Sequence, residues 1–373
     1  MRKELKNLRK ELIYVRERGD SFLSDANLEW QAFYIFIKRY RAIHSDCKLP
    51  DIEDSYGVKE DTDLSANSPY HKTFKPYLEY IKSKCHGFKV ADTEPMLELS
   101  ENLKKLEFSD IQRLEKIISR CDIENFTLKT FSLEEFDEFF LSIQKIVVTG
   151  ERLNDTGISK QFAKVIAQYL PKKSTYLPYR DFYSDIAQQA NFNELNLLIS
   201  FKENKTHIKS NVWSLLRLLL NGNKNIQLLY STKAEADFAF YYPDPLNFKR
   251  RIKDKGKKYF KGKLEFDLIN ASLKDNGQLF IVLPAAFLHM QRNYYQDFRQ
   301  ILFSTKNVKS ITKFPSNMID NNVSIPHCFI HIDYSQKYNH IRFIDGKSIA
   351  LTEHRKQDSE TVLAQVSSYL NGE

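Results

Sequence analysis

Glycine is scarce in this chain, and the shortage limits which ligands the backbone can approach closely. The sequence has 11 glycines among 373 residues, about 3% where soluble proteins average roughly 7%. No glycine lies between Gly157 and Gly222. A glycine-rich turn that places bare backbone against a ligand is therefore excluded from this stretch, and the chain has neither a Walker phosphate loop nor a nucleophile elbow.

Paired cysteines, metal motifs and long apolar runs are also absent. The four cysteines form no CxxC pair and the histidines form no HExxH motif, so we expect no disulfide framework and no metal. His327, Cys328 and His331 fall in an alternating apolar stretch, where we expect strand packing. Apolar runs such as 279–288 are shorter than the roughly 18 residues of a membrane span, and the charged start at 1–12 has no secretory core. We expect a cytoplasmic protein with no membrane partner.

Hydrophobic and basic residues are plentiful. Hydrophobic residues make up 42% and aromatic residues 13% of the chain, enough for a sizeable core, which excludes disorder throughout. Lysine and arginine number 56 against 48 acidic residues, a formal net charge of +8. Excess positive charge favours a polyanionic partner without identifying it. The length predicts two domains, or one domain with a large extension.

The hydrophobic pattern changes near Gly150. Before it, apolar residues mostly recur at helical spacing, and Ser132 with Glu135 has the pattern of a capping box that opens a helix. After it, short apolar runs alternate with amphipathic stretches, which is typical of βα units and a mainly parallel sheet. We predict three parts: a mostly helical N-terminal domain over 1–149, an α/β domain over 150–336, and a C-terminal extension with a strand and a tail helix over 337–373.

Individual elements of the α/β region can be placed from their patterns. We predict helices at 159–170, opened by a capping Ser159, and at 211–222, 264–277 and 295–306. The third of these ends in Asn276-Gly277, a typical C-cap. We predict strands within 193–202, 225–231, 236–242, 308–314 and 325–334, and at the start of 278–288.

The order of scaffold residues near the C-terminal end carries a resemblance. One strand ends at Pro284, the following helix contains Arg299, and the next strand is followed by Pro315. With these features, the stretch 150–333 resembles the catalytic domain of the N6-adenine DNA methyltransferases, specifically the modification (M) subunits of type I restriction systems. The resemblance implies a Rossmann-like methyltransferase sheet after a helical domain, with DNA and restriction-modification or defence subunits as partners.

The cofactor turn of that family is altered here. The family binds S-adenosylmethionine over a strand-to-helix turn that contains two or three glycines. Pro178 matches the family's proline, but Asp181, Phe182 and Tyr183 stand where the glycines belong. Glu203 is the candidate for the acidic residue that holds the ribose hydroxyls, and its alternative role is a solvated glutamate at a strand end. A Cβ at the turn would collide with the cofactor, so we expect none to bind.

The catalytic motif is altered as well. The family carries Asn-Pro-Pro followed by an aromatic residue, and the asparagine accepts a hydrogen bond from the adenine amino group while the ring stacks on the flipped base. Tyr242, Pro243, Asp244 and Pro245 occupy this place. A tyrosine has no amide oxygen, and its hydroxyl lies further from the backbone. Asp244 in a shifted register is the alternative acceptor. We expect the bulky residues at both altered motifs to fill the donor cleft.

A basic segment at 248–263 follows the altered motif. It contains one acidic residue, Asp254, and nine basic residues, so its charge of nine minus one equals the +8 of the whole chain. The resemblance places it as a loop at the mouth of the target-base site, where cations contact phosphates and Tyr259 or Phe260 stacks on bases. The alternative is a solvated loop without a ligand. The predicted nucleic-acid contacts are Lys249, Arg250, Arg251, Lys253, Lys255, Lys257, Lys258, Lys261 and Lys263.

Three functions follow from these observations. The first is a pseudoenzyme: a catalytically degenerate methyltransferase-like protein that binds nucleic acid or scaffolds a restriction-modification or defence complex. The second is an active S-adenosylmethionine-dependent N6-adenine DNA methyltransferase with atypical motifs. The third is a protein-interaction module without nucleic acid, for which the aromatic stripe of Phe136, Phe139 and Phe140 offers an interface unless it is buried in the core.

Overall fold

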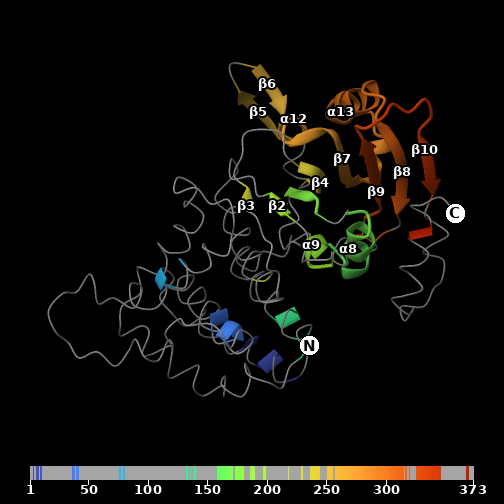
Figure 1. The fold of residues 1–373 in the computed structure, drawn as a ribbon. Coiled ribbons are helices and arrows are strands. Elements are labelled where there is room, and N and C mark those ends of the chain that lie inside the picture. The colour runs from blue at the N-terminus through green and yellow to red at the C-terminus, as the bar shows by residue number, and fades with distance from the viewer. Residues whose placement is uncertain are drawn as a thin grey trace. The chain divides into compact units, whose positions relative to one another are not determined.

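The computed structural model describes the second part of the chain most fully (Figure 1). Besides isolated residues elsewhere, the described ranges are 158–170, 173–179, 185–189, 196–198, 228–229, 236–243, 250–254, 257–314 and 325–345. The chain divides into two compact units, one formed by 1–153 with 203–226 and the other by 154–202 with 227–373. The domain limits predicted from the sequence stay a prediction.

In the first unit the described residues are helical apart from Ser132. The predicted capping box is confirmed. The backbone N–H of Glu135 donates to the Ser132 hydroxyl at 3.2 Å, and the Ser132 N–H donates to the Glu135 carboxylate at 3.0 Å. Phe139 is completely buried, so this member of the aromatic stripe belongs to a core. Phe136 and Phe140 lie outside the described residues.

The second unit contains an eight-stranded sheet in the order β10-β8-β9-β7-β4-β1-β2-β3. All neighbours are parallel except that β9 is antiparallel to both β7 and β8. The predicted mainly parallel α/β fold is therefore confirmed. The strands are β1 (Thr175–Tyr179), β2 (Asn196–Leu198), β3 (Leu228–Leu229), β4 (Ala236–Tyr241), β7 (Leu273–Pro284), β8 (Val308–Phe314), β9 (His327–Asp333) and β10 (Arg342–Asp345).

Helices cover both faces of this sheet. They are α8 (Lys160–Ala167), α9 (Asp185–Gln189), α12 (Lys261–Asn270), the 3₁₀ turn η5 (Ala285–Leu288) and α13 (Asn293–Ser304). The predicted cap of α8 is confirmed, because the Ser159 hydroxyl accepts from the Phe162 N–H at 3.2 Å. Among the described residues, no helix has the length and apolar character that crossing a membrane requires.

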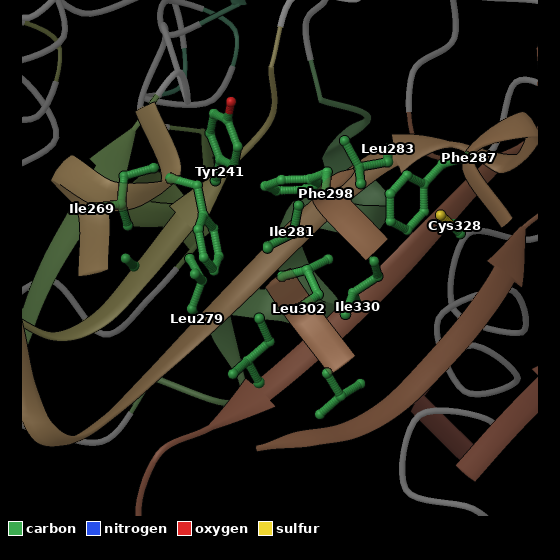
Figure 2. Close-up of a cluster of buried hydrophobic side chains, with 14 of the residues drawn as sticks. Tyr241, Ile269, Leu279, Ile281, Leu283, Phe287, Phe298, Leu302, Cys328 and Ile330 are labelled. Carbon is green, nitrogen blue, oxygen red and sulfur yellow. The ribbon is translucent and has the colours of Figure 1, made fainter. Parts of the chain in front are cut away.

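Side chains along β7 alternate between two cores. Leu279, Ile281 and Leu283 point to one face, where they pack with Phe298 and Leu302 of α13 (Figure 2). Each of these side chains is at most 2% exposed, and burying one contributes roughly 1.5–3 kcal/mol. This core holds α13 against the strands.

On the opposite face of the sheet, the core contains several packed aromatic rings. The ring of Phe280 lies 5.4 Å from Phe329 of β9 and 6.1 Å from Tyr169, which follows α8. Phe162 of α8 meets Phe329 edge-on at 5.6 Å. Edge-to-face and offset pairs of this kind add to the area that burial removes from water, so α8 is held by aromatic contacts.

The predicted helix over 264–277 is wrong at both ends. The helix ends at Asn270, and β7 begins at Leu273, so Asn276-Gly277 lies within a strand. The pairing of β7 with β4 shifts at this place. A Cβ on Gly277 would lie 3.0 Å from the Lys274 carbonyl oxygen and 3.2 Å from that of Ala236. The glycine is therefore present because two backbones approach closely, a use it also has in bulges.

Candidate functional site

The sheet reverses its strand order beside β1. The chain proceeds from β1 outward through β2 to β3 and then returns to β4 on the other side of β1. In open α/β sheets, ligands bind in the crevice outside the carboxyl ends of the strands at such a reversal. Pro178 lies near the end of β1, where its backbone is in register with Phe240 of β4. Asp181, Phe182, Tyr183 and Glu203 lie outside the described residues, so their assignment stays a prediction.

Tyr242 and Pro243 come directly after β4, and both are buried. The Tyr242 hydroxyl lies 3.2 Å from Nε2 of His327, the first residue of β9. Their rings meet edge-on with centroids 5.7 Å apart. Because β7 lies between β4 and β9, the Tyr242 side chain extends across the end of β7, away from β1. Asp244 and Pro245 lie outside the described residues.

This direction corrects one expectation. Tyr242 was expected to fill the donor cleft, which in this fold lies between β1 and β4, but its ring extends toward β9 instead. The physical reason is that β9 offers a buried ring nitrogen as a hydrogen-bond partner, and a buried hydroxyl without a partner is costly. Phe182 and Tyr183, the other residues expected to fill the cleft, lie outside the described residues.

His327 is a neutral ring where it meets the Tyr242 hydroxyl. Burial lowers the pKa of His327 from 6.5 to about 4, although a hydrogen bond to the Ile325 backbone opposes the shift. At neutral pH the ring is uncharged, and one of its nitrogens carries the proton while the other accepts. Since Nε2 faces Tyr242, Nδ1 is left for the Ile325 backbone, and the Tyr242 hydroxyl is the donor. That hydroxyl is thus engaged inside the protein.

Tyr241 makes the corresponding contact on the opposite face. Its hydroxyl donates to the Glu265 carboxylate of α12 at 2.8 Å, and Glu265 is only 4% exposed. Lys261, one helical turn earlier, lies 3.6 Å from the same carboxylate. Figure 2 shows Tyr241 at the edge of the cluster that contains Leu279 and Ile269. Sequence reasoning missed this pair, because nothing in the sequence relates a strand tyrosine to a glutamate 24 residues later.

The basic segment is not a loop, as the sequence predicted, but a β-hairpin that leads into α12. Strand β5 (Arg251–Asp254) pairs with β6 (Lys257–Phe260) in antiparallel register, with Asp254 opposite Lys257. This pairing leaves Lys255 and Gly256 between the strands. A glycine in a two-residue connection between extended runs is a hairpin signal, and the high charge of the segment concealed it.

The structure separates the predicted nucleic-acid contacts into groups. Arg250 and Arg251 are exposed. Lys253, Lys257 and Lys258 are placed on the hairpin strands by their backbone. Lys261 and Lys263 lie in α12, each beside a carboxylate one turn later, with Lys263 at 2.5 Å from Asp267. Lys249 and Lys255 lie outside the described residues. Among the basic residues of this segment whose side chains are described, Arg250 and Arg251 are therefore the two without a carboxylate within ion-pair distance.

Arg299 fixes the segment that follows β7 at the carboxyl edge. Its guanidinium donates to the backbone carbonyls of Phe287 and Met290, the latter at 2.9 Å, and lies over the Phe287 ring. An arginine fork suits two acceptors at once. The family's arginine in this helix thus has a structural role in this chain, connecting α13 to η5.

The three residues for which we expected strand packing lie in a strand. His327, Cys328 and His331 all lie in β9, as predicted. Burial raises the pKa of the Cys328 thiol to about 12, and His331 Nε2 lies 2.8 Å from the Gln278 side-chain oxygen. Within the described residues, no three His, Cys, Asp or Glu side chains gather as a metal site would require.

No family model and no curated protein matches this sequence. Solved structures do match it in fold. The methyltransferase subunit of a type I restriction-modification system from Streptococcus thermophilus superposes with a TM-score of 0.57 at 15% identity, over 99% of this chain and 93% of that one. A protein from Vibrio vulnificus YJ016, assigned as the modification subunit of a type I restriction enzyme, superposes with a TM-score of 0.63 at 13% identity. The match covers 99% of this chain and 90% of that one.

These matches confirm, at the level of the fold, the resemblance that the sequence predicted. At such identities the likeness concerns the fold alone, because one fold supports many functions. The structural neighbours of this chain are type I restriction-modification methyltransferase subunits, and the chain has the α/β fold of a methyltransferase.

Proposed function

We propose that this chain is a catalytically degenerate methyltransferase-like protein that binds nucleic acid beside other subunits of a restriction-modification or defence system. The observation that carries the proposal is the basic hairpin. It follows β4 at the carboxyl edge of the sheet, the edge where ligands of α/β sheets bind. Its register places Lys253 opposite Lys258. Like charges at directly opposite positions destabilise a hairpin, and a phosphate backbone beside them relieves that repulsion.

The hairpin provides affinity rather than sequence selectivity. Cations that contact phosphates release condensed counterions, and each contact adds about 0.9 to the slope of log affinity against log salt for duplex DNA. Such contacts position a protein on nucleic acid but do not read bases. Selectivity is then supplied by partner subunits, which agrees with a scaffold in a larger complex.

The altered catalytic position supports the degenerate part of the proposal. Tyr242 stands where the family has its asparagine, and its hydroxyl is already hydrogen-bonded to His327 inside the protein. The side chain is 1% exposed. Methyl transfer to adenine requires an acceptor that faces the amino group, and Tyr242 does not present one. Without glycines at residues 181–183, the turn after β1 also lacks the bare backbone on which S-adenosylmethionine lies.

Charge reversal on the hairpin tests nucleic-acid binding. The full chain with Lys257→Glu and Lys258→Glu is compared with a matched control, Lys306→Glu and Lys309→Glu. Both control lysines are exposed; Lys306 lies in the turn before β8 and Lys309 lies in β8. Fluorescence anisotropy with labelled DNA should show strongly weakened binding and a smaller salt slope for the hairpin variant only. Equal affinities of the two variants would contradict the proposal and favour a protein-interaction module.

Methyl transfer is tested separately. Calorimetry with S-adenosylmethionine should give no heat of binding, and tritium from the labelled donor should not appear in adenine-containing DNA above background. Micromolar donor binding together with label transfer would overturn the degenerate assignment. It would leave an active N6-adenine methyltransferase with atypical motifs, while the hairpin result decides the binding part independently.

A further inference from the structure

Two arginines and two aromatic rings connect the basic hairpin to helix α13. The Arg251 guanidinium lies over the Phe260 ring at 5.4 Å, and the Phe260 ring lies 5.6 Å from that of Tyr294 in the first turn of α13. Arg292, immediately before α13, donates to the Tyr294 hydroxyl at 3.3 Å. We call these four residues the arginine–aromatic joint. In Figure 1 the hairpin projects above α12.

The joint is at least partly exposed, and its two arginines have no carboxylate partner among the described residues. Arg251 and Arg292 are exposed, while Phe260 and Tyr294 are partly exposed. Across the described part of the chain, neither arginine lies within ion-pair distance of a carboxylate, whereas Lys261, Lys263 and Lys274 each have one. The Tyr294 ring also packs against that of Tyr295, with centroids 4.4 Å apart. The arrangement therefore places positive charge beside partly exposed rings.

Arginine and aromatic side chains in this combination suit one class of ligand. A guanidinium matches the geometry of a phosphate better than an ammonium does. Partly exposed rings beside it provide surfaces on which bases stack, and only unpaired bases offer their faces for stacking. A duplex would use the arginines but not the rings. The joint therefore favours a single strand.

We infer that Arg292 and Tyr294 extend the hairpin surface onto α13, and that the arginine–aromatic joint binds single-stranded nucleic acid by phosphate contacts and base stacking. This inference rests on the proposed nucleic-acid function and adds the ligand class and two residues outside the basic segment. Sequence reasoning missed both residues, because they lie in a different element from the run of basic residues.

The test compares three ligands on the full chain: a labelled oligothymidine of about 20 nucleotides, a duplex of equal length, and a polyglutamate peptide. Tyr294→Ala should weaken oligothymidine binding about fivefold to a hundredfold, the usual effect of removing one stacking ring, with little change for the duplex. Tyr294→Phe keeps the stacking ring but removes the hydroxyl that Arg292 contacts, so it should restore most of the affinity that the alanine variant loses. Arg292→Gln should reduce the salt slope for the single strand by about 0.7.

The outcomes separate this inference from the function on which it rests. If the hairpin charge reversal removes binding but Tyr294→Ala and Arg292→Gln behave as the parent, the joint is not part of the surface and only this inference fails. If the hairpin reversal itself has no effect, the proposed function fails too. Polyglutamate binding as tight as oligothymidine binding would overturn the assignment to nucleic acid. Equal melting temperatures of the variants show that folding does not account for the losses.

Discussion

Acidification should destabilise the second unit through two buried histidines in β9. His327 and His331 are 1% and 7% exposed, and burial lowers the pKa of each from 6.5 to about 4. For His331, the nearby Lys309 lowers the pKa further while Asp333 opposes the shift. Between about pH 4 and 6.5 these two histidines are protonated in the unfolded chain but neutral in the folded chain. Stability is therefore fully present above pH 6.5 and is lost as the pH falls toward 4.

The magnitude follows from the two pKa values. A tenfold difference in proton affinity corresponds to 1.36 kcal/mol, so a pKa lowered from 6.5 to about 4 costs on the order of 3 kcal/mol for each ring at acid pH. Both rings together cost about 6 kcal/mol, which lies within the roughly 5–15 kcal/mol total stability of typical domains. In the steep part of the range, each ring contributes up to about 1.4 kcal/mol per pH unit.

Urea unfolding between about pH 7.5 and 4.5 measures the effect, with the free energy of unfolding obtained by linear extrapolation. His327→Gln and His331→Gln retain a hydrogen-bonding side chain but do not titrate, so the double variant should lose up to about 2.7 kcal/mol per pH unit of slope. His340→Gln, at an exposed position, is the control. Carboxylates such as Asp333 contribute a slope of the same sign, and the variants separate the two. A double variant whose slope equals that of the parent would refute the reasoning.

Three further substitutions test contacts that position the site. Gly277→Ala should lower the free energy of unfolding by roughly 1–3 kcal/mol, because its Cβ would press on two carbonyl oxygens; the urea midpoint reports it. Tyr241→Phe removes the donor to a buried carboxylate and should cost about 1–3 kcal/mol, whereas a loss below 0.5 kcal/mol would mean that water replaces the hydroxyl. Arg299→Met removes two hydrogen bonds to the segment after β7. Amide hydrogen exchange should accelerate in residues 285–290 while β9 stays protected. Unchanged exchange in residues 285–290 would contradict the assigned role of Arg299.

Local patterns explain which parts of the fold were predictable. The strand over 308–314 coincides with β8, and Ser159 and Ser132 cap helices as predicted, because alternation and capping depend on neighbouring residues. Gly277 misled the prediction because its role depends on the backbone of Ala236, 41 residues earlier. From neighbouring residues alone, an Asn-Gly pair after an amphipathic stretch is interpreted as a helix C-cap.

The candidate site was less predictable for the same reason. Tyr242 and His327 are 85 residues apart, and only the sheet order brings the two strands within reach of one hydroxyl. The altered motif was recognisable as a position in the chain, but the direction of the Tyr242 ring was not. The hairpin was not recognised for a different reason. A strand is identified from apolar residues at every second position, and this highly charged segment has too few apolar residues to show that alternation.

Under the proposed function, the two tyrosines at the end of β4 separate binding from chemistry within one domain. Successive residues of a strand point to opposite faces, and here Tyr241 is hydrogen-bonded to α12 on one face while Tyr242 is hydrogen-bonded to β9 on the other. The position from which the family presents acceptors to a base is thus engaged internally on both sides. The contact of Tyr241 with Glu265 also anchors α12, the helix that follows the basic hairpin. One hydrogen bond therefore both engages the residue before the altered motif and stabilises the base of the basic hairpin.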